Sequence, residues 1–310
     1  MIYILGHKNP DTDSVCSPII VEWYLNNIKN QEAKAILHND INRETEFILE
    51  YWGFKKPEIV DKLPSGAKVF LVDTTNPDEL PLIQEDTEII EIVDHHKLGG
   101  ISTSKPISVN IKPIACTTTI LYLKFLEENP GLKIPKKIAG LMLSAILSDT
   151  LNFRSPTTTD IDKKVAHELE RMAEIENIDK YANKMFDAKS SIEGMSMNSI
   201  INADAKEYLL GSKKSLVAVF ETVKPQVVIE KQTDITSEIQ NIKSNDGYEM
   251  VFFFVIDILN QIAYYFFSGE QENTVISKGY NCTIADNGIT ALDGIVSRKK
   301  QIVPVLEENA

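Results

Sequence analysis

The chain has 310 residues, which is long enough for two domains of ordinary size. Hydrophobic residues make up 43% and charged residues 25%, values typical of an ordinary soluble globular protein rather than a disordered one. The formal net charge of -13 argues against nonspecific binding of nucleic acid, which requires clustered Lys and Arg.

Short apolar strands alternate with amphipathic helices in the first half. We expect strands at Met1–Leu5, Lys34–Leu37, Val69–Val72 and Ile89–Val93, and helices at Val15–Ile28, Thr117–Glu127, Ile138–Ile146 and from about Asp160. This alternation predicts an α/β domain, at residues 1–187, with a parallel sheet and helices on both faces. A small, polar segment at residues 188–194 is interpreted as a linker or hinge.

Residues 195–310 predict a smaller α+β domain. Its expected elements are strands at Leu216–Phe220, Glu249–Ile256 and Ala263–Phe267 and a helix around Asp234–Ile242. The apolar run 251–267 is nearly long enough for a membrane span. Asp257, Asn260 and Gln261 interrupt it, so we interpret it as two buried strands joined near residue 260 and expect no membrane association. Three widely spaced cysteines without a CxxC pair favour a reducing, cytoplasmic location.

Four polar motifs follow predicted strand ends or an apolar helix. They are His7–Ser14, Asp73-Thr74-Thr75, Asp94-His95-His96 and Ser148-Asp149-Thr150. Ligand sites of open α/β sheets lie outside the carboxyl ends of the strands, so these motifs can converge in space. Alone, a DxD is more often a turn and a His-His pair more often ordinary polar surface or core. Their conjunction favours a metal site.

The residue types in these motifs suit Mn²⁺ or Co²⁺, because carboxylates and imidazoles ligate such ions and no thiolate lies in the motifs. Four aspartates and two histidines exceed the needs of one octahedral ion. Two ions sharing a carboxylate are the economical interpretation. Such a pair can deprotonate a bridging water and stabilise both oxygens of a phosphoryl transfer.

The run Ser297-Arg298-Lys299-Lys300-Gln301 is the densest positive segment of an acidic chain. A run of three charges is by default a solvated patch. However, Arg grips phosphate through two parallel hydrogen bonds and Lys adds point charges. If the C-terminal domain closes over the metal site, this run would clamp an anionic substrate against the metals.

At these motifs the chain resembles the DHH phosphoesterase superfamily, specifically the family II (manganese-dependent) inorganic pyrophosphatases. The resemblance rests on GHKNPDTDS at residues 6–14, on DHH and SDT, and on SRKKQ, and extends to about Pro304. It implies hydrolysis of pyrophosphate in a cleft between two domains. It also implies a homodimer, two Mn²⁺ or Co²⁺ ions per subunit, and additional Mg²⁺ that accompanies the substrate.

The resemblance also implies residue roles. The first metal would be bound by His7, Asp11 and Asp73, and the second by Asp13, Asp73, His95 and Asp149, with Asp73 bridging. His96 would donate to a phosphate oxygen, Asp149 would assist proton removal from water, and Lys206, Arg298 and Lys299 would grip pyrophosphate. Many family members have His-Asn-Glu after the bridging Asp, where this chain has Thr74-Thr75-Asn76, which leaves metal preference and rate open.

The resulting hypothesis is direct attack of a metal-bridging hydroxide on one phosphorus of pyrophosphate, without a covalent intermediate. An exopolyphosphatase of the same superfamily would share most of these site residues and is an alternative. A phosphodiesterase for cyclic dinucleotides or short oligonucleotides would need stacking surfaces or a Gly-rich loop that the sequence does not reveal. A non-catalytic metal or phosphate sensor is the remaining alternative.

Overall fold

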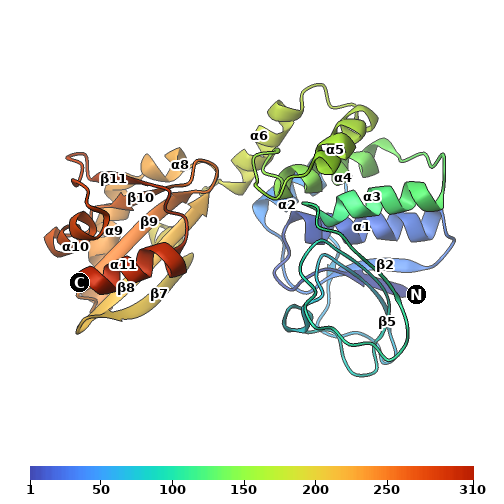
Figure 1. Ribbon diagram of the computed structural model, residues 1–310, viewed down its shortest axis with the longest axis horizontal. Helices are drawn as coiled ribbons and strands as arrows, with labels where there is room; N and C mark the ends of the chain where they lie inside the picture. Colours follow the sequence, from blue (N-terminus) through green and yellow to red (C-terminus); the bar gives the residue numbers. More distant parts are fainter. The chain divides into compact units, whose positions relative to one another are not determined.

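The computed structural model describes residues 1–310 and consists of two compact units, Met1–Ala188 and Lys189–Ala310 (Figure 1). Helix α6 (Ile178–Lys189) ends the first unit and extends into the segment that the sequence marks as a linker. None of the helices combines the length and the apolar character that a membrane crossing requires.

Parallel strands and helices alternate in the first unit. The strands are β1 (Ile2–Leu5), β2 (Ala33–Leu37), β3 (Glu58–Ile59), β4 (Lys68–Val72), β5 (Glu88–Asp94) and β6 (Ser108–Ile111). The helices are α1 (Thr12–Asn27), α2 (Arg43–Trp52), the 3₁₀ turn η1 (Pro77–Glu79), α3 (Thr117–Glu128), α4 (Lys136–Asp149), α5 (Asp160–Ala173) and α6. The strands and helices expected in this half are therefore confirmed.

The six strands of this sheet run in the order β3-β2-β1-β4-β5-β6, and every pairing is parallel. From β1 the chain proceeds to β2 on one side, and later to β4 on the other. The boundary between β1 and β4 is therefore the topological switch point, where open α/β sheets bind ligands. The carboxyl ends of β1, β4 and β5, which carry three of the polar motifs, are neighbours there.

Helices cover only one face of this sheet, which corrects the expectation of helices on both. Helices α1 and α3 contact the strands on that face (Figure 1). On the other face, the hydrophobic cluster draws its non-strand residues from loops, including Leu63, Leu80 and Ile101, and contains no α-helical residue. The connections after β4 and β5 are rich in Pro, Gly, Asp and Thr, which favour turns over helices.

The second unit is an α+β sandwich around a five-stranded sheet in the order β11-β10-β9-β8-β7. Its strands are β7 (Asp204–Leu210), β8 (Lys213–Thr222), β9 (Met250–Asp257), β10 (Ile262–Phe266) and β11 (Ile289–Asp293). Its helices are α7 (Met197–Ile201), α8 (Gln226–Ile229), α9 (Gln232–Asn245), α10 (Glu270–Tyr280), the π-helical turn η2 (Arg298–Ile302) and α11 (Val303–Asn309). The strands and the helix expected in this half are confirmed.

The apolar run in this unit forms two antiparallel strands, β9 and β10, as the sequence predicts. The carboxylate of Asp257 accepts hydrogen bonds from the backbone N–H groups of Leu259 and Asn260, both at 3.0 Å. Gln261 completes the turn at φ 57°. Strand β9 is buried along its whole length, between one hydrophobic cluster on each sheet face.

Gly140 of α4 provides a test of the packing in the first unit. A Cβ there would lie 2.3 Å from the Trp52 ring, which is itself fixed by hydrogen bonds from Nε1 to Ser144 Oγ and Tyr181 OH. We expect Gly140→Ala to lower the free energy of unfolding by about 1–3 kcal/mol through overpacking, measured by denaturant titration. Helix propensity alone predicts the opposite sign, a gain of roughly 0.5–1 kcal/mol. In a Trp52→Leu background the same change should be neutral or stabilising.

Candidate metal centre

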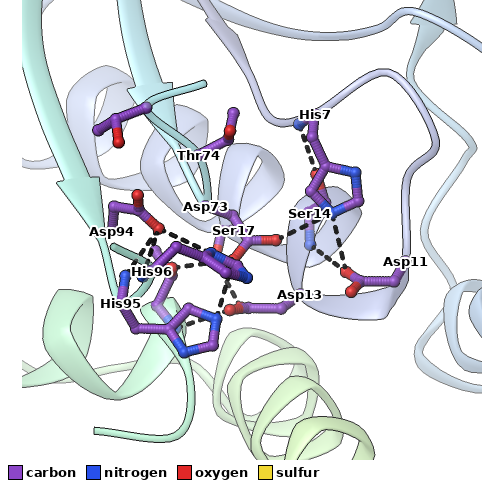
Figure 2. A network of polar contacts seen from close by, with 12 residues as sticks. His7, Asp11, Asp13, Ser14, Ser17, Asp73, Thr74, Asp94, His95 and His96 are labelled. Atoms are coloured by element: carbon purple, nitrogen blue, oxygen red, sulfur yellow. Dashed lines mark hydrogen bonds and ion pairs between the residues drawn. The ribbon is translucent and has the colours of Figure 1, made fainter. Parts of the chain in front are cut away.

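Asp73 occupies the middle of the site. It follows β4 with φ 61°, a left-handed conformation that Asp tolerates better than most residues, and its side chain is buried. Oδ2 lies 3.4 Å from His7 Nε2 and Oδ1 lies 3.3 Å from His95 Nε2 (Figure 2). One carboxylate therefore lies between two imidazoles and presents one oxygen to each.

The loop after β1 supplies one side of the centre. The ligand atoms of His7, Asp11 and Asp73 all lie within 4.8 Å of one another. Asp11 is also the N-cap of α1, where its Oδ1 accepts from the backbone N–H of Ser14 at 3.0 Å. A Cβ on Gly6 would lie 2.0 Å from Ser14 Oγ, so glycine is needed for the His7 loop to press against α1.

The remaining predicted ligands fall into two adjoining groups. Asp13 and Asp149 lie within 4.8 Å of each other and of the thiol of Cys116, while Asp73 and His95 lie in a group with His96. Cys116 corrects the expectation that no thiol is near. It precedes α3, far from the motifs in sequence, and reaches the site only because α3 begins at this sheet edge.

Asp13 is held by the N-terminus of α3. Its carboxylate accepts from the backbone N–H groups of Thr117 (2.7 Å) and Thr118 (3.2 Å). The hydroxyls of Thr118 (2.7 Å) and Ser17 (2.8 Å) donate to it as well. Thr117 Oγ1 also donates to Asp73 at 3.1 Å. Free N–H groups and the helix dipole stabilise an anion at such a position. These threonines were not predicted from the sequence, although a run of threonines at a helix start is a visible signal.

The two histidines of the DHH motif are oriented differently. His95 Nδ1 lies 3.2 Å from the carbonyl oxygen of Ile114, which directs Nε2 toward Asp73. Asp94 Oδ1 accepts from the backbone N–H groups of His95 and His96 and lies 2.9 Å from His96 Nδ1. Asp94 therefore fixes the motif without joining a ligand group, and the half-exposed His96 ring is left with Nε2 for another partner.

The electrostatics show that this group of side chains is short of positive charge. Burial alone would lower the pKa of His7 and His95, but hydrogen bonds to the surrounding carboxylates raise these pKa values to about 10 and about 9. Burial, followed by the charges of the other aspartates, raises the pKa of Asp13 and raises that of Asp149 well above its usual range. Oδ2 of Asp149 is buried without a hydrogen-bond donor, and Oδ2 of Asp73 is buried with the His7 imidazole 3.4 Å away. Buried carboxylate oxygens without donors, next to imidazoles, fit divalent cations.

Thr74 and Thr75 stand where many family members have His and Asn, and their hydroxyls form hydrogen bonds within the loop after β4 and to the loop after β5. Thr74 Oγ1 donates to Glu79 Oε2 at 2.8 Å, and Thr75 Oγ1 accepts from the backbone N–H of Gly99 at 2.7 Å. They line a cavity of about 350 Å³ that also reaches His96. Both threonines therefore shape the loops beside the centre, and neither belongs to the ligand groups.

The predicted clamp residues belong to the second unit. Lys206 lies on β7, and Arg298 begins the π-helical turn η2. Arg298 Nη2 lies 2.8 Å from Asp204 Oδ1, and Nη1 donates to the backbone carbonyl of Asp204 at 2.6 Å. The side chain of Lys299 is exposed. The fold thus brings Arg298 to the strand that carries Lys206.

Asp162 supports the centre from α5 and was not found from the sequence, although Thr159-x-x-Asp162 matches a capping box. It is buried and accepts from the backbone N–H of Ala115 (3.1 Å) and from Thr119 Oγ1 (2.7 Å). It thereby fixes the start of α3, on which Asp13 depends.

We expect Asp162→Asn to weaken Mn²⁺ binding by about tenfold or more, because an outer group that orients the ligands is lost. Titration of metal-free protein with Mn²⁺ measures this. Asp160→Asn is the matched control, since that side chain is fully exposed at the same helix start. Equal Mn²⁺ affinity in both variants would contradict the role of Asp162.

Residues 1–146 match the DHH family, N-terminal domain, and residues 183–309 match the DHHA2 domain. The chain is 37% identical over 306 residues to a "Probable manganese-dependent inorganic pyrophosphatase" of Clostridium acetobutylicum, covering 99% of this chain and 97% of that one. It is 35% identical over 313 residues to the "Manganese-dependent inorganic pyrophosphatase" of Methanocaldococcus jannaschii, covering 99% and 98%.

Solved structures agree with these relatives. The "Crystal structure of Methanococcus jannaschii putative family II inorganic pyrophosphatase" matches with a TM-score of 0.64 and 33% identity, covering 100% of this chain and 99% of that one. An exopolyphosphatase-related protein from Bacteroides fragilis shares the fold, with a TM-score of 0.52, 14% identity, and 99% and 91% of the two chains covered. The resemblance predicted from the motifs is confirmed: the chain belongs to the family II, manganese-dependent inorganic pyrophosphatases of the DHH phosphoesterase superfamily.

Proposed function

We propose that the protein hydrolyses inorganic pyrophosphate to two orthophosphates at a dinuclear Mn²⁺ or Co²⁺ centre. The observation that carries the proposal is the Asp73 carboxylate, whose two oxygens face His7 and His95 from the two sides of the site. A carboxylate placed in this way suits a bridge between two ions. The names of the curated relatives support the substrate and the metal.

The ligand groups suggest how two ions would be held. His7, Asp11 and Asp73, which form one of the ligand groups, would bind one ion. The resemblance assigns the other ion to Asp13, Asp73, His95 and Asp149, which come from the two remaining groups. When bound, such a pair would acidify a shared water and stabilise the attacking and leaving oxygens of an in-line displacement. The carboxylate of Asp149 would assist proton removal from that water as well as serve as a ligand.

His96 is the proposed proton or hydrogen-bond donor to a phosphate oxygen. Asp94 holds its Nδ1, so Nε2 is the nitrogen left to face the substrate. The hydrogen bond that the His96 ring donates to the Asp94 carboxylate raises the pKa of His96, although burial opposes the shift. A raised pKa favours the protonated ring, which can donate to the oxygen that gains charge as the phosphoanhydride bond breaks.

Lys206, Arg298 and Lys299 would bind the phosphate oxygens of the substrate, together with Mg²⁺ that accompanies pyrophosphate. In a chain with a net charge of -13, they and the metals would supply the positive charge that an anionic substrate needs. The closing of the second unit over the metal centre, the homodimer, the cytoplasmic location and the absence of nucleic-acid and membrane partners stay predictions of the same interpretation.

The decisive experiment is phosphate release by metal-stripped protein reloaded with Mn²⁺ plus Mg²⁺, with pyrophosphate, tripolyphosphate and a cyclic dinucleotide as substrates. We expect fast release that is selective for pyrophosphate. Asp73→Ala should reduce turnover by more than about 100-fold, beyond the loss caused by removing a supporting group alone. Asp78→Ala, an exposed carboxylate on the same loop, should match the wild type.

Other outcomes separate the alternatives. Preference for tripolyphosphate would indicate an exopolyphosphatase, and preference for the dinucleotide would indicate a phosphodiesterase. Metal binding without turnover on any of the three substrates would favour a sensor. Near-normal turnover of Asp73→Ala would overturn the metal centre itself.

The role of Asp94 predicts a shift in the pH profile. If protonated His96 donates to the substrate, kcat/KM falls as pH rises through the pKa of His96. Asp94→Asn removes the charge that raises this pKa, so the basic limb of the kcat/KM profile should move to lower pH. Asp94→Glu keeps the negative charge, so its basic limb should lie closer to the wild-type position than that of Asp94→Asn. A basic limb that stays in place in Asp94→Asn, with normal Mn²⁺ content, would contradict the assignment.

A further inference from the structure

Asp204, at the start of β7, is the partner of Arg298 in the second unit. The contact uses both ends of Asp204: its carboxylate lies 2.8 Å from Nη2, and its backbone carbonyl accepts from Nη1 at 2.6 Å. The Arg298 side chain is only 11% exposed, whereas that of Asp204 is 52% exposed. Asp204, the more exposed residue of the pair, therefore holds the Arg298 guanidinium against the strand.

The register of the sheet places this pair on the same face as Lys206. In the antiparallel β7–β8 ladder, Asp204 is opposite Val219 and Lys206 is opposite Val217. Directly opposed residues share a face, and both valines belong to the hydrophobic cluster that includes Ile302 and Val303. Figure 1 shows α11, which continues from η2, lying along this side of β7 and β8. Arg298 thus contacts the strand that carries Lys206, on the same face of the sheet, although the two residues are 92 positions apart in sequence.

The rest of the SRKKQ segment builds the turn that delivers Arg298. Ser297 Oγ accepts from the backbone N–H of Lys300 at 3.3 Å. Gln301 Oε1 accepts from the backbone N–H groups of Val296 (2.9 Å) and Ser297 (3.0 Å), and its Nε2 donates to the carbonyl of Gly294 (2.7 Å). The polar ends of the motif fix the backbone, and Asp204 fixes the guanidinium.

A second carboxylate, Glu221, is near the same guanidinium. Glu221 lies two residues beyond Val219 on β8, diagonal to Asp204 in the ladder. Burial raises the pKa of Glu221, Asp204 raises it further, and Arg298 opposes the shift, so all three groups are close enough to interact. Glu221 is therefore a further anionic group close to Arg298 on this face of the sheet.

We propose that Asp204 is a positioning residue for the phosphate-binding Arg298. It holds the guanidinium in one orientation beside Lys206, so that the N–H groups not used by Asp204 receive a phosphate of the substrate. This inference rests on the proposed function, since it assumes that Arg298 binds pyrophosphate. The guanidinium has more donors than Asp204 can occupy, so holding and binding are compatible. In the alternative, Asp204 blocks Arg298 until substrate displaces it. Removal of the Asp204 carboxylate would then raise kcat/KM instead of lowering it.

The test compares Mn²⁺-loaded full-length variants with pyrophosphate as substrate. We expect Asp204→Ala to lower kcat/KM by about tenfold, mostly through a higher KM, because a preorganised charge-assisted contact is lost. Asp204→Asn keeps an oxygen that can accept from Arg298 and should fall between the wild type and Asp204→Ala. Asp234→Ala, which removes an exposed carboxylate of α9 in the same unit, is the matched control and should equal the wild type.

A double-mutant comparison distinguishes positioning from a general charge effect. If Asp204 acts only through Arg298, the Arg298→Ala/Asp204→Ala variant should be no worse than Arg298→Ala alone. Mn²⁺ content and the unfolding midpoint should stay unchanged in Asp204→Ala. A kcat/KM equal to or above that of the wild type, or losses that multiply in the double variant, would overturn the proposal.

Binding of imidodiphosphate, a non-hydrolysable analogue of pyrophosphate, tests the role of Asp204 independently of whether the protein hydrolyses pyrophosphate. If the wild type fails to hydrolyse pyrophosphate, the proposed function fails, and the comparison of the same variants by calorimetry still decides the role of Asp204. Weaker imidodiphosphate binding in Asp204→Ala than in Asp234→Ala supports it. Equal binding in the two variants rejects it.

Discussion

The concentration of buried carboxylates at one edge of the first sheet is the constraint on which the site depends. Asp13, Asp73 and Asp149 approach one another in surroundings that raise the pKa of Asp13 and Asp149. Protein groups compensate only part of this cost, through the N-terminus of α3 on Asp13 and the two imidazoles on Asp73. The uncompensated part disfavours the metal-free state, and in the proposed centre the same carboxylates would give divalent cations their binding energy.

The sheet order explains how ligands from distant parts of the chain meet. Strands β1, β4 and β5 are neighbours, so the loops that follow them reach the same edge. Helix α3 begins beside this edge, and α4 delivers Asp149 in its last turn. Asp162 then connects α5 to the start of α3. A change in one of these packing contacts would move a ligand without altering any motif.

Local patterns in the sequence predict the strands and the polar loops because both are encoded by neighbouring residues. The supporting groups were not predictable in the same way. Cys116, Thr117 and Asp162 matter only because particular helix ends meet at the sheet edge, and local sequence patterns do not reveal which ends meet. The prediction of helices on both faces of the sheet was wrong for a related reason. Alternation of strands and helices predicts helical cover, whereas the turn-rich connections after β4 and β5 leave that face to loops.

The two units share one physical arrangement. In the first, Asp94 contacts one ring nitrogen of His96, which leaves the other for the proposed contact with substrate. In the second, Asp204 contacts two nitrogens of Arg298 and leaves further N–H groups available. In each case an aspartate of the same unit reduces the rotational freedom of a cationic group before substrate arrives, which lowers the entropy lost on binding. The acidic character of the chain is therefore compatible with an anionic substrate, because some of its carboxylates orient the positive charges rather than repel the phosphate.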